Sequence, residues 1–469
     1  MDEYKKLTQN TLILMIGTMG SRVISFLMLR FYTGVLTTAE YGIVDLLLQI
    51  SNFMIPICTI GVTTGVIRFG LDGRYRQRDV FSTALLCLGM GFLVCLIVAL
   101  AAGFLPLSDN IGPYLFWMLF LVTASSLNSI CGAFVRSLER VRVYAIAGIL
   151  NAVCNVLLMI LFLKVFQFGI RGYMLAVMLA DTVTALFLIF SNKLWRFIRF
   201  GGLYLSTFAE MLKFSIPTIP ATISWWIIDM SDRLMITNFL GAAANGIYSV
   251  AAKIPSIVTI IANVFISAWQ ISIIGTENKE RQTQFYSSVI RAYTAILFVM
   301  ASVVTLFAHL IVTLLTTESY YEAEQFVPLL ISATIFSCLG TFVGNIYIVE
   351  KKSVPQFVTT MIGAVCNVAL NWILIPVYGI YGAVIATVAS FALLFVVRIF
   401  HTRKYMKLKW SPVRFLISFL FLAVQNWAAQ STAWTFYGVQ ILCGAGIVIV
   451  NFRPLLAGVQ KINPFHRKK

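Results

Sequence analysis

Four basic residues lie inside hydrophobic stretches that are long enough to cross a bilayer: Arg22, Arg30, Arg233 and Lys253. A charge near the middle of a membrane costs at least ~2.5–3.5 kcal/mol on insertion scales, so it normally faces a polar interior or a partner. Arg22 lies too deep for its side chain to reach either interface, whereas Arg30 can extend to the outer one. Because a guanidinium donates paired hydrogen bonds to phosphate, these residues predict a cavity for an anionic cargo, with diphosphate as a suitable group.

Four acidic residues share these stretches: Asp45, Asp181, Asp229 and Asp232. Each could neutralise a cation or carry a coupling ion. Asp229 and Arg233 stand four residues apart, so an intrahelical salt bridge is the alternative to a cargo site for that arginine. A buried carboxylate can also exchange a proton or a cation with its surroundings, which would couple transport to H+ or Na+. Neutralisation is the better interpretation of Asp45, and both interpretations stay open for Asp181.

Prolines flank two of the four cations. Pro217 and Pro220 precede Arg233 in one apolar stretch, and Pro255 follows Lys253 in the next. Proline removes a backbone donor and bends a helix, which membrane helices tolerate beside partners or cavities. We therefore expect the first stretch to bend at its two prolines and the second to kink beside Lys253.

The composition identifies the class of protein that must position these residues. Hydrophobic residues make up 59% of the 469 residues and charged residues only 11%, with a mean hydropathy of +0.89. A soluble domain does not carry this much apolar surface. The apolar runs are continuous and about 20 residues long, as spanning helices require, and do not alternate as barrel strands do. We predict an all-α polytopic membrane protein with about fourteen transmembrane helices, at 11–33, 43–67, 80–105, 113–135, 143–166, 170–190, 211–239, 247–274, 287–315, 326–349, 355–377, 379–400, 412–430 and 434–452.

The net charge of +17 follows an orientation pattern. Most of the 35 Lys and Arg residues fall on loops and helix ends that share a side with the N-terminus, so the positive-inside rule places both termini in the cytoplasm. This pattern explains the charge without a nucleic-acid partner. The eight cysteines all lie inside spans, none in a CxxC pair, and only three histidines occur, so we expect neither a metal site nor a cofactor.

Short sequence matches predict an internal duplication. Ala-Val-Cys-Asn-Val occurs at 152–156 and at 364–368, and LTTAEYGI at 36–43 resembles LGAAANGI at 240–247, which sets Arg30 opposite Arg233. Each copy contains six spans, so the copies are parallel repeats with a cargo site expected between them near mid-bilayer. We expect an N-terminal six-helix bundle at 1–200, a second bundle at 201–405, and two additional helices with a basic cytoplasmic tail at 406–469.

Several motifs resemble those of the Wzx-type polysaccharide flippases of the MOP superfamily. The motifs are Ser21-Arg22, Glu40-Tyr41-Gly42, Ser231-Asp232-Arg233, Phe239-Leu240-Gly241 and the segment 246–255. The resemblance implies two pseudo-symmetric bundles around a cavity, as in MATE-type transporters, with alternating access. It implies that undecaprenyl-diphosphate-linked oligosaccharide moves from the inner to the outer leaflet of a bacterial plasma membrane. Arg22 would line the cavity, and Arg233 and Lys253 would line its opposite wall. The implied partners are the lipid-linked sugar, membrane lipid and other polysaccharide-assembly proteins of the membrane.

Two other functions compete with this interpretation. A multidrug exporter of the same superfamily, coupled to sodium or protons, would expel cationic drugs and favour acids in its cavity. A membrane enzyme acting on lipid-linked sugars would need a sizeable external loop with convergent catalytic groups. The longest outer loop, 316–325, offers three glutamates but no histidine or arginine, so we do not expect an enzyme.

Overall fold

The computed structural model describes residues 20, 23–24, 26–102, 112–198, 205–273, 279–350, 352–430 and 434–462. Within these residues all regular elements are helices, and eleven helices are long and apolar enough to cross a membrane. The expected all-α multi-pass membrane protein is confirmed, whereas the number of fourteen spans stays a prediction. The chain divides into two compact units, Met1–Gly246 (unit 1) and Ile247–Lys469 (unit 2). The assignment of three domains is a separate prediction that this division does not test.

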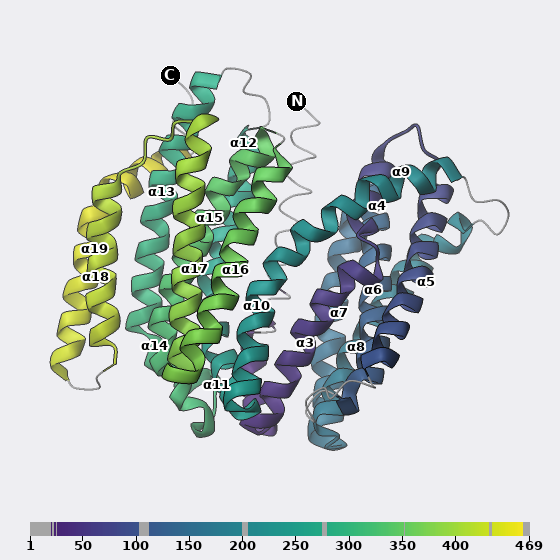
Figure 1. Cartoon of the computed structure of the whole chain (residues 1–469), viewed down its shortest axis with the longest axis horizontal. Helices are drawn as coiled ribbons and strands as arrows, with labels where there is room; N and C mark the ends of the chain where they lie inside the picture. Colours follow the sequence, from purple (N-terminus) through teal and green to yellow (C-terminus); the bar gives the residue numbers. More distant parts are fainter. Residues whose placement is uncertain are drawn as a thin grey trace. The chain divides into compact units, whose positions relative to one another are not determined.

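Unit 1 is a bundle in which α6 packs against α3, α4, α5 and α8, while α10 lies along α3 (Figure 1). Its apolar core includes Phe81 and Phe134, whose ring centroids lie 4.5 Å apart. A π-helical turn, Ile160–Val165, extends α7. The helices are α2 (Leu29–Val35), α3 (Thr38–Cys58), α4 (Val62–Leu71), α5 (Gln77–Ala102), α6 (Leu115–Ser137), α7 (Val141–Met159), α8 (Gly169–Asn192), α9 (Leu205–Ser215), α10 (Ile219–Leu240) and the start of α11 (Ala242–Lys253).

The predicted span 43–67 has the wrong bounds, because the apolar helix α3 covers Thr38–Cys58 and the chain turns before α4. Ile60 and Gly61 between them have positive φ angles of 49° and 65°. A Cβ on Gly61 would lie 2.8 Å from the Ser215 carbonyl oxygen, so only glycine lets this turn approach the end of α9. The break therefore depends on a contact distant in sequence, which the apolar run could not reveal.

The bends expected near the prolines are present. A 3₁₀ turn, Ile216–Thr218, separates α9 from α10 beside Pro217 and Pro220. Likewise α11 ends at Lys253, directly before Ile254 and Pro255, and α12 begins at Ser256. Both kinks follow from the backbone donor that proline lacks.

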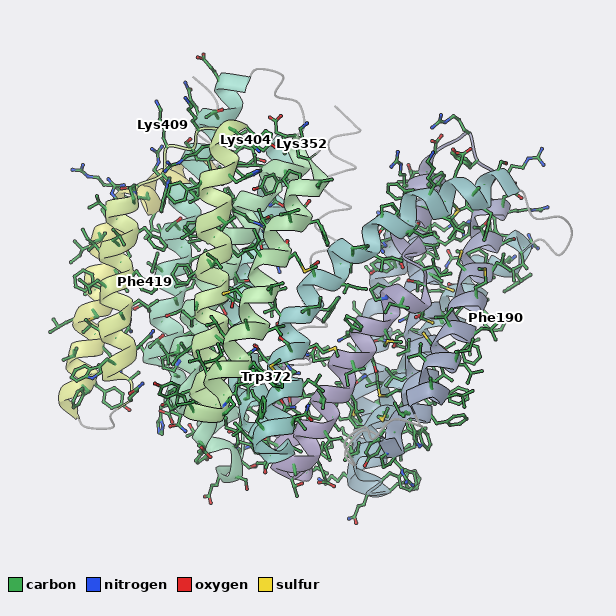
Figure 2. The ribbon with its side chains drawn as sticks, viewed as in Figure 1. Phe190, Lys352, Trp372, Lys404, Lys409 and Phe419 are labelled. Atoms are coloured by element: carbon green, nitrogen blue, oxygen red, sulfur yellow. The ribbon has the colours of Figure 1, made fainter. Side chains whose placement is uncertain are left out.

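Unit 2 contains two helix groups. In one, α17 packs against α15 and α16; in the other, α18 and α19 pair with each other and pack on α13 (Figure 1). Lys352, Lys404 and Lys409 lie at one end of this unit (Figure 2), in keeping with the one-sided charge pattern of the sequence. The remaining helices are α12 (Ser256–Ile273), α13 (Lys279–Leu306), α14 (Ala308–Leu315), α15 (Val327–Val349), α16 (Ser353–Tyr378), α17 (Ile380–His401), α18 (Pro412–Ala428) and α19 (Trp434–Ile462).

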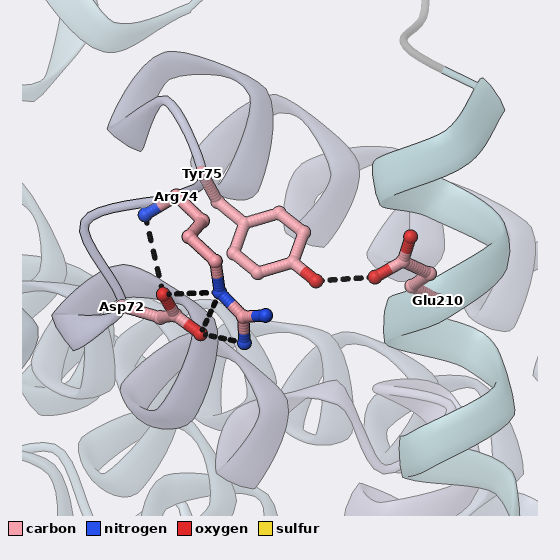
Figure 3. A network of polar contacts seen from close by, with 4 residues as sticks. All are labelled: Asp72, Arg74, Tyr75 and Glu210. Carbon is pink, nitrogen blue, oxygen red and sulfur yellow. Dashed lines mark hydrogen bonds and ion pairs between the residues drawn. The ribbon is translucent and has the colours of Figure 1, made fainter.

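A polar network holds α9 to the loop between α4 and α5 in unit 1 (Figure 3). The Tyr75 hydroxyl donates a hydrogen bond to the Glu210 carboxylate of α9. Arg74 Nη2 lies 2.7 Å from Asp72 Oδ2, and this charge-assisted hydrogen bonding lowers the pKa of Asp72 to about 2. The hydrogen bond to Glu210 raises the pKa of Tyr75. The loop therefore keeps a defined shape where it meets α9.

Two glycines at matching positions of the 36–43 and 240–247 segments contact each other's helix. A Cβ on Gly42 of α3 would overlap the Ala242 carbonyl oxygen, and a Cβ on Gly246 of α11 would overlap the Thr38 carbonyl oxygen. Asn245 Nδ2 also donates to the Gly42 carbonyl at 2.7 Å. Small residues permit such close helix approach in membranes.

Gly42→Ala is expected to destabilise the protein by about 1–3 kcal/mol, because the added methyl group overpacks the α3–α11 contact. Gly89 of α5 has no atom within 4 Å of its ideal Cβ, so Gly89→Ala is the matched control. Thermal unfolding of the purified protein in detergent measures the difference. An unchanged melting temperature for Gly42→Ala would contradict the contact.

Candidate functional site

An ion pair between α3 and α10 is the centre of the candidate site. Arg233 Nε lies 2.5 Å from Asp45 Oδ2, and the two side chains are only 11% and 4% exposed. In a low-dielectric interior, a charge is tolerated when an opposite charge and hydrogen bonds compensate its lost hydration. Asp45 and Arg233, both predicted site residues, thus form a direct ion pair.

The other two acids of this cluster lie on α10 beside Arg233. Asp232 is 1% exposed, whereas the Asp229 side chain is exposed. Arg233 Nη1 donates to the Asp229 backbone carbonyl at 2.7 Å, and the carboxylate on its Nε comes from Asp45 of α3. At its Nε, Arg233 thus pairs with a carboxylate of a different helix.

Two other predicted cations lie on other helices. Arg30 is exposed on α2, a short helix whose Tyr32 ring stands edge-on to Tyr173 of α8, with centroids 5.3 Å apart. Lys253 ends α11 and is half-buried in unit 2. Arg22 lies outside the described residues.

Asp181 of α8 occupies a separate polar network in unit 1. Asn128 Nδ2 donates to Asp181 Oδ1 at 3.0 Å and Asn151 Nδ2 donates to the same oxygen at 2.9 Å, while the Ser125 hydroxyl donates to Oδ2. Asn151 Nδ2 also contacts Thr184 Oγ1 at 3.1 Å. All these groups are neutral, and among the described residues no Lys or Arg pairs with Asp181. A carboxylate stabilised by neutral donors can take up a proton without breaking an ion pair.

Arg398 of α17 is a buried cation that our sequence interpretation counted only among the inner basic residues. It is 1% exposed in unit 2. Its Nη1 donates to the Gly340 carbonyl at 2.9 Å, and its Nε and Nη2 donate to Thr359 and Thr360 Oγ1 at 3.2 and 2.7 Å. A Cβ on Gly344 would lie 2.6 Å from Nη1, so this glycine makes room for the guanidinium. The two glycines, one helical turn apart in α15, are the only sequence signal that could have indicated this burial.

Comparisons with known proteins bear on the function of this arrangement. A family model described as "Polysaccharide biosynthesis protein" matches residues 7–270, and one described as MatE matches residues 217–373. No curated protein matches the chain in sequence.

The fold is similar to that of three solved transport proteins. For the lipid II flippase MurJ in an inward closed conformation, the TM-score is 0.72 at 13% identity, covering 96% of this chain and 99% of that one. For an inward-facing multidrug resistance MATE family transporter of the MOP superfamily, it is 0.64 at 16% identity, covering 82% and 94%. For a MOP superfamily transporter from Pyrococcus furiosus, it is 0.59 at 14% identity, covering 92% and 97%. These likenesses establish the fold.

Asp45→Asn is expected to destabilise the protein by about 3–5 kcal/mol, because it leaves the buried charge of Arg233 without its carboxylate. Glu318→Gln removes the same charge from an exposed side chain outside this cluster and is the control. Chemical unfolding in detergent measures both, and a double-mutant cycle with Arg233→Gln isolates the coupling. Equal effects of the two substitutions would show that Asp45 is not the essential partner.

Proposed function

This chain belongs to the polysaccharide biosynthesis protein family, and from that premise we propose that it is a flippase for lipid-linked oligosaccharides. The observation that carries the proposal is the match of the family model over residues 7–270. The cargo would be an undecaprenyl-diphosphate-linked oligosaccharide, moved from the inner to the outer leaflet of a bacterial plasma membrane. The fold shared with a protein described as a lipid II flippase supports a lipid-linked cargo.

The charges inside the spans support a diphosphate as the recognised group. Asp45 and the Asp229 carbonyl hold the Arg233 guanidinium at a fixed position in a low-dielectric environment. A fixed guanidinium binds a diphosphate with less loss of side-chain freedom than a mobile one. Arg22, Arg30 and Lys253 stay predicted cargo contacts on the basis of the sequence.

The movement proposed is alternating access, with both termini in the cytoplasm. Prolines and the Gly61 turn divide the spans of unit 1 into shorter helices, and such joints let one part of a transporter tilt while its neighbours stay packed. The end of unit 2 that holds Lys352, Lys404 and Lys409 would face the cytoplasm (Figure 2).

A cation-coupled multidrug exporter is the second candidate. The MatE match over 217–373 and the three acids around Arg233 favour it, because acidic groups suit cationic drugs. Expression in a drug-susceptible host separates the two functions. Increased drug resistance without any effect on surface polysaccharide would favour the exporter.

Deletion of the gene in its own host is expected to abolish the surface polysaccharide and to leave lipid-linked repeat units in the inner leaflet. Lipid extraction with leaflet-specific labelling measures the accumulation. Complementation with Arg22→Ala is expected to fail although the protein inserts, whereas Lys404→Ala, at a helix end, is expected to restore export. Normal polysaccharide in the deletion strain, with no second flippase present, would contradict the function; full activity of Arg22→Ala would contradict only the cargo role of that residue.

We further propose that Asp181 exchanges the coupling ion, H+ or Na+. Its three neutral donors support this role, because the carboxylate can be charged or neutralised without the rupture of an ion pair. A protonated Asp181 would carry an O–H donor, so one neighbouring group would have to accept a hydrogen bond where it now donates one. The Ser125 hydroxyl can do either.

Asp181→Asn is expected to lower the rate of gradient-driven flipping in proteoliposomes by roughly tenfold or more, because the amide cannot exchange the coupling ion. The residual flipping should no longer depend on an imposed proton or sodium gradient. Glu318→Gln, at an exposed residue outside the candidate site, serves as the control for loss of a charge. Gradient dependence that survives in Asp181→Asn would move the coupling site elsewhere.

A further inference from the structure

A small pocket opens where α13, α18 and α19 meet in unit 2. Arg291 Nη1 contacts the Lys409 carbonyl oxygen at 3.5 Å, and the Lys409 backbone N–H donates to Ser287 Oγ at 2.9 Å, so the segment before α18 is fixed on α13. The pocket therefore has a defined shape. Its lining consists of Arg291, Thr294, Trp410, Ser411, Arg414, Phe415, Asn451 and Pro454.

The pocket is basic, and the part of the chain that supplies most of its lining, from Trp410 to Pro454, contains no acid. After Glu350 the sequence contains thirteen Lys and Arg residues and not one Asp or Glu. Within the described residues, neither Arg291 nor Arg414 forms an ion pair with a carboxylate. Lys409 adjoins the pocket and is exposed. The two guanidinium groups of the pocket therefore carry positive charge without a carboxylate bonded to either of them in the described part of the chain.

The surroundings of the pocket suit a lipid. Trp410 is half-buried and directly follows Lys409, which lies at one end of the unit (Figure 2). Tryptophan is enriched at membrane–water interfaces. Below it, α18 and α19 expose apolar side chains: Leu416 is 62% exposed, Leu420 66% and Ile449 74%. A phospholipid whose phosphate contacts the two arginines would therefore place its acyl chains beside an apolar helix surface.

We propose that this pocket binds the phosphate headgroup of an anionic bilayer phospholipid, with Arg291 and Arg414 as its charged donors. Basic pockets between transmembrane helices on the cytoplasmic side bind such headgroups. The site uses the two helices outside the predicted duplication and is separate from the Asp45–Arg233 cluster. It gives α18 and α19 a role in anchoring unit 2 to anionic lipid.

Thermal unfolding of the purified full chain in mixed micelles tests the proposal. Phosphatidylglycerol is expected to raise the melting temperature above the value in phosphatidylcholine with the same acyl chains. Native mass spectrometry is expected to show phosphatidylglycerol binding weakened roughly tenfold in Arg291→Gln/Arg414→Gln, since two charged phosphate contacts are lost. The control Arg403→Gln/Lys407→Gln removes the same charge from two exposed residues of the segment between α17 and α18. This variant should keep the binding.

Each other outcome overturns the proposal. Equal stability of the wild-type protein in the two lipids excludes a selective lipid site, whatever the variants do. Equal loss in both double variants indicates diffuse attraction to the basic surface. Inorganic phosphate that reproduces the stabilisation points to a free anion, and poly-glutamate that reproduces it points to an acidic protein segment.

Discussion

An arginine in the hydrocarbon layer needs a partner inside the protein, and the partner of Arg233 is on a different helix. Asp45 of α3 meets Arg233 of α10 at 2.5 Å, so the charge requirement of one helix fixes the position of the other. With α10 set against α3, the glycine contact at the ends of α3 and α11 falls into register. The hydrophobic effect does not drive helices together in lipid, where tails are as apolar as the side chains, so packing and polar contacts must do so. The ion pair therefore decides how the middle of unit 1 is assembled.

Two further charged residues, Asp181 and Arg398, form hydrogen bonds with neutral groups. Asp181 receives hydrogen bonds from three neutral side chains of α6 and α7, and Arg398 gives its hydrogen bonds to a carbonyl and two hydroxyls of α15 and α16. Each charge ties three helices together, because its donors or acceptors come from both neighbours. Unit 1 and unit 2 thus each contain a three-helix group held by one ion and several dipoles.

Sequence reasoning reached the parts of this fold that depend on local chemistry. Continuous apolar runs predicted the helices, and Pro217, Pro220 and Pro255 predicted the kinks, since their causes lie in the residues themselves. It missed the turn at Gly61, because the reason for that turn is a close approach to Ser215. The same limit applies to the site: types and depths of the charged residues could be read from the chain, but partners that lie far apart in sequence could not.

Under the proposed duplication, Gly42 and Gly246 are the same residue of two copies, and so are Thr38 and Ala242. Each glycine faces the carbonyl at the start of the other copy's helix, so the contact is made twice in a reciprocal manner. That is the pattern of an isologous interface in a two-fold symmetric homodimer. The crossing of α3 and α11 can then be understood as the remnant of a subunit interface, retained after two half-length chains became one. After fusion the two copies could diverge in sequence. Position 41 now holds a tyrosine, whereas the matching position 245 holds the asparagine that donates to the Gly42 carbonyl.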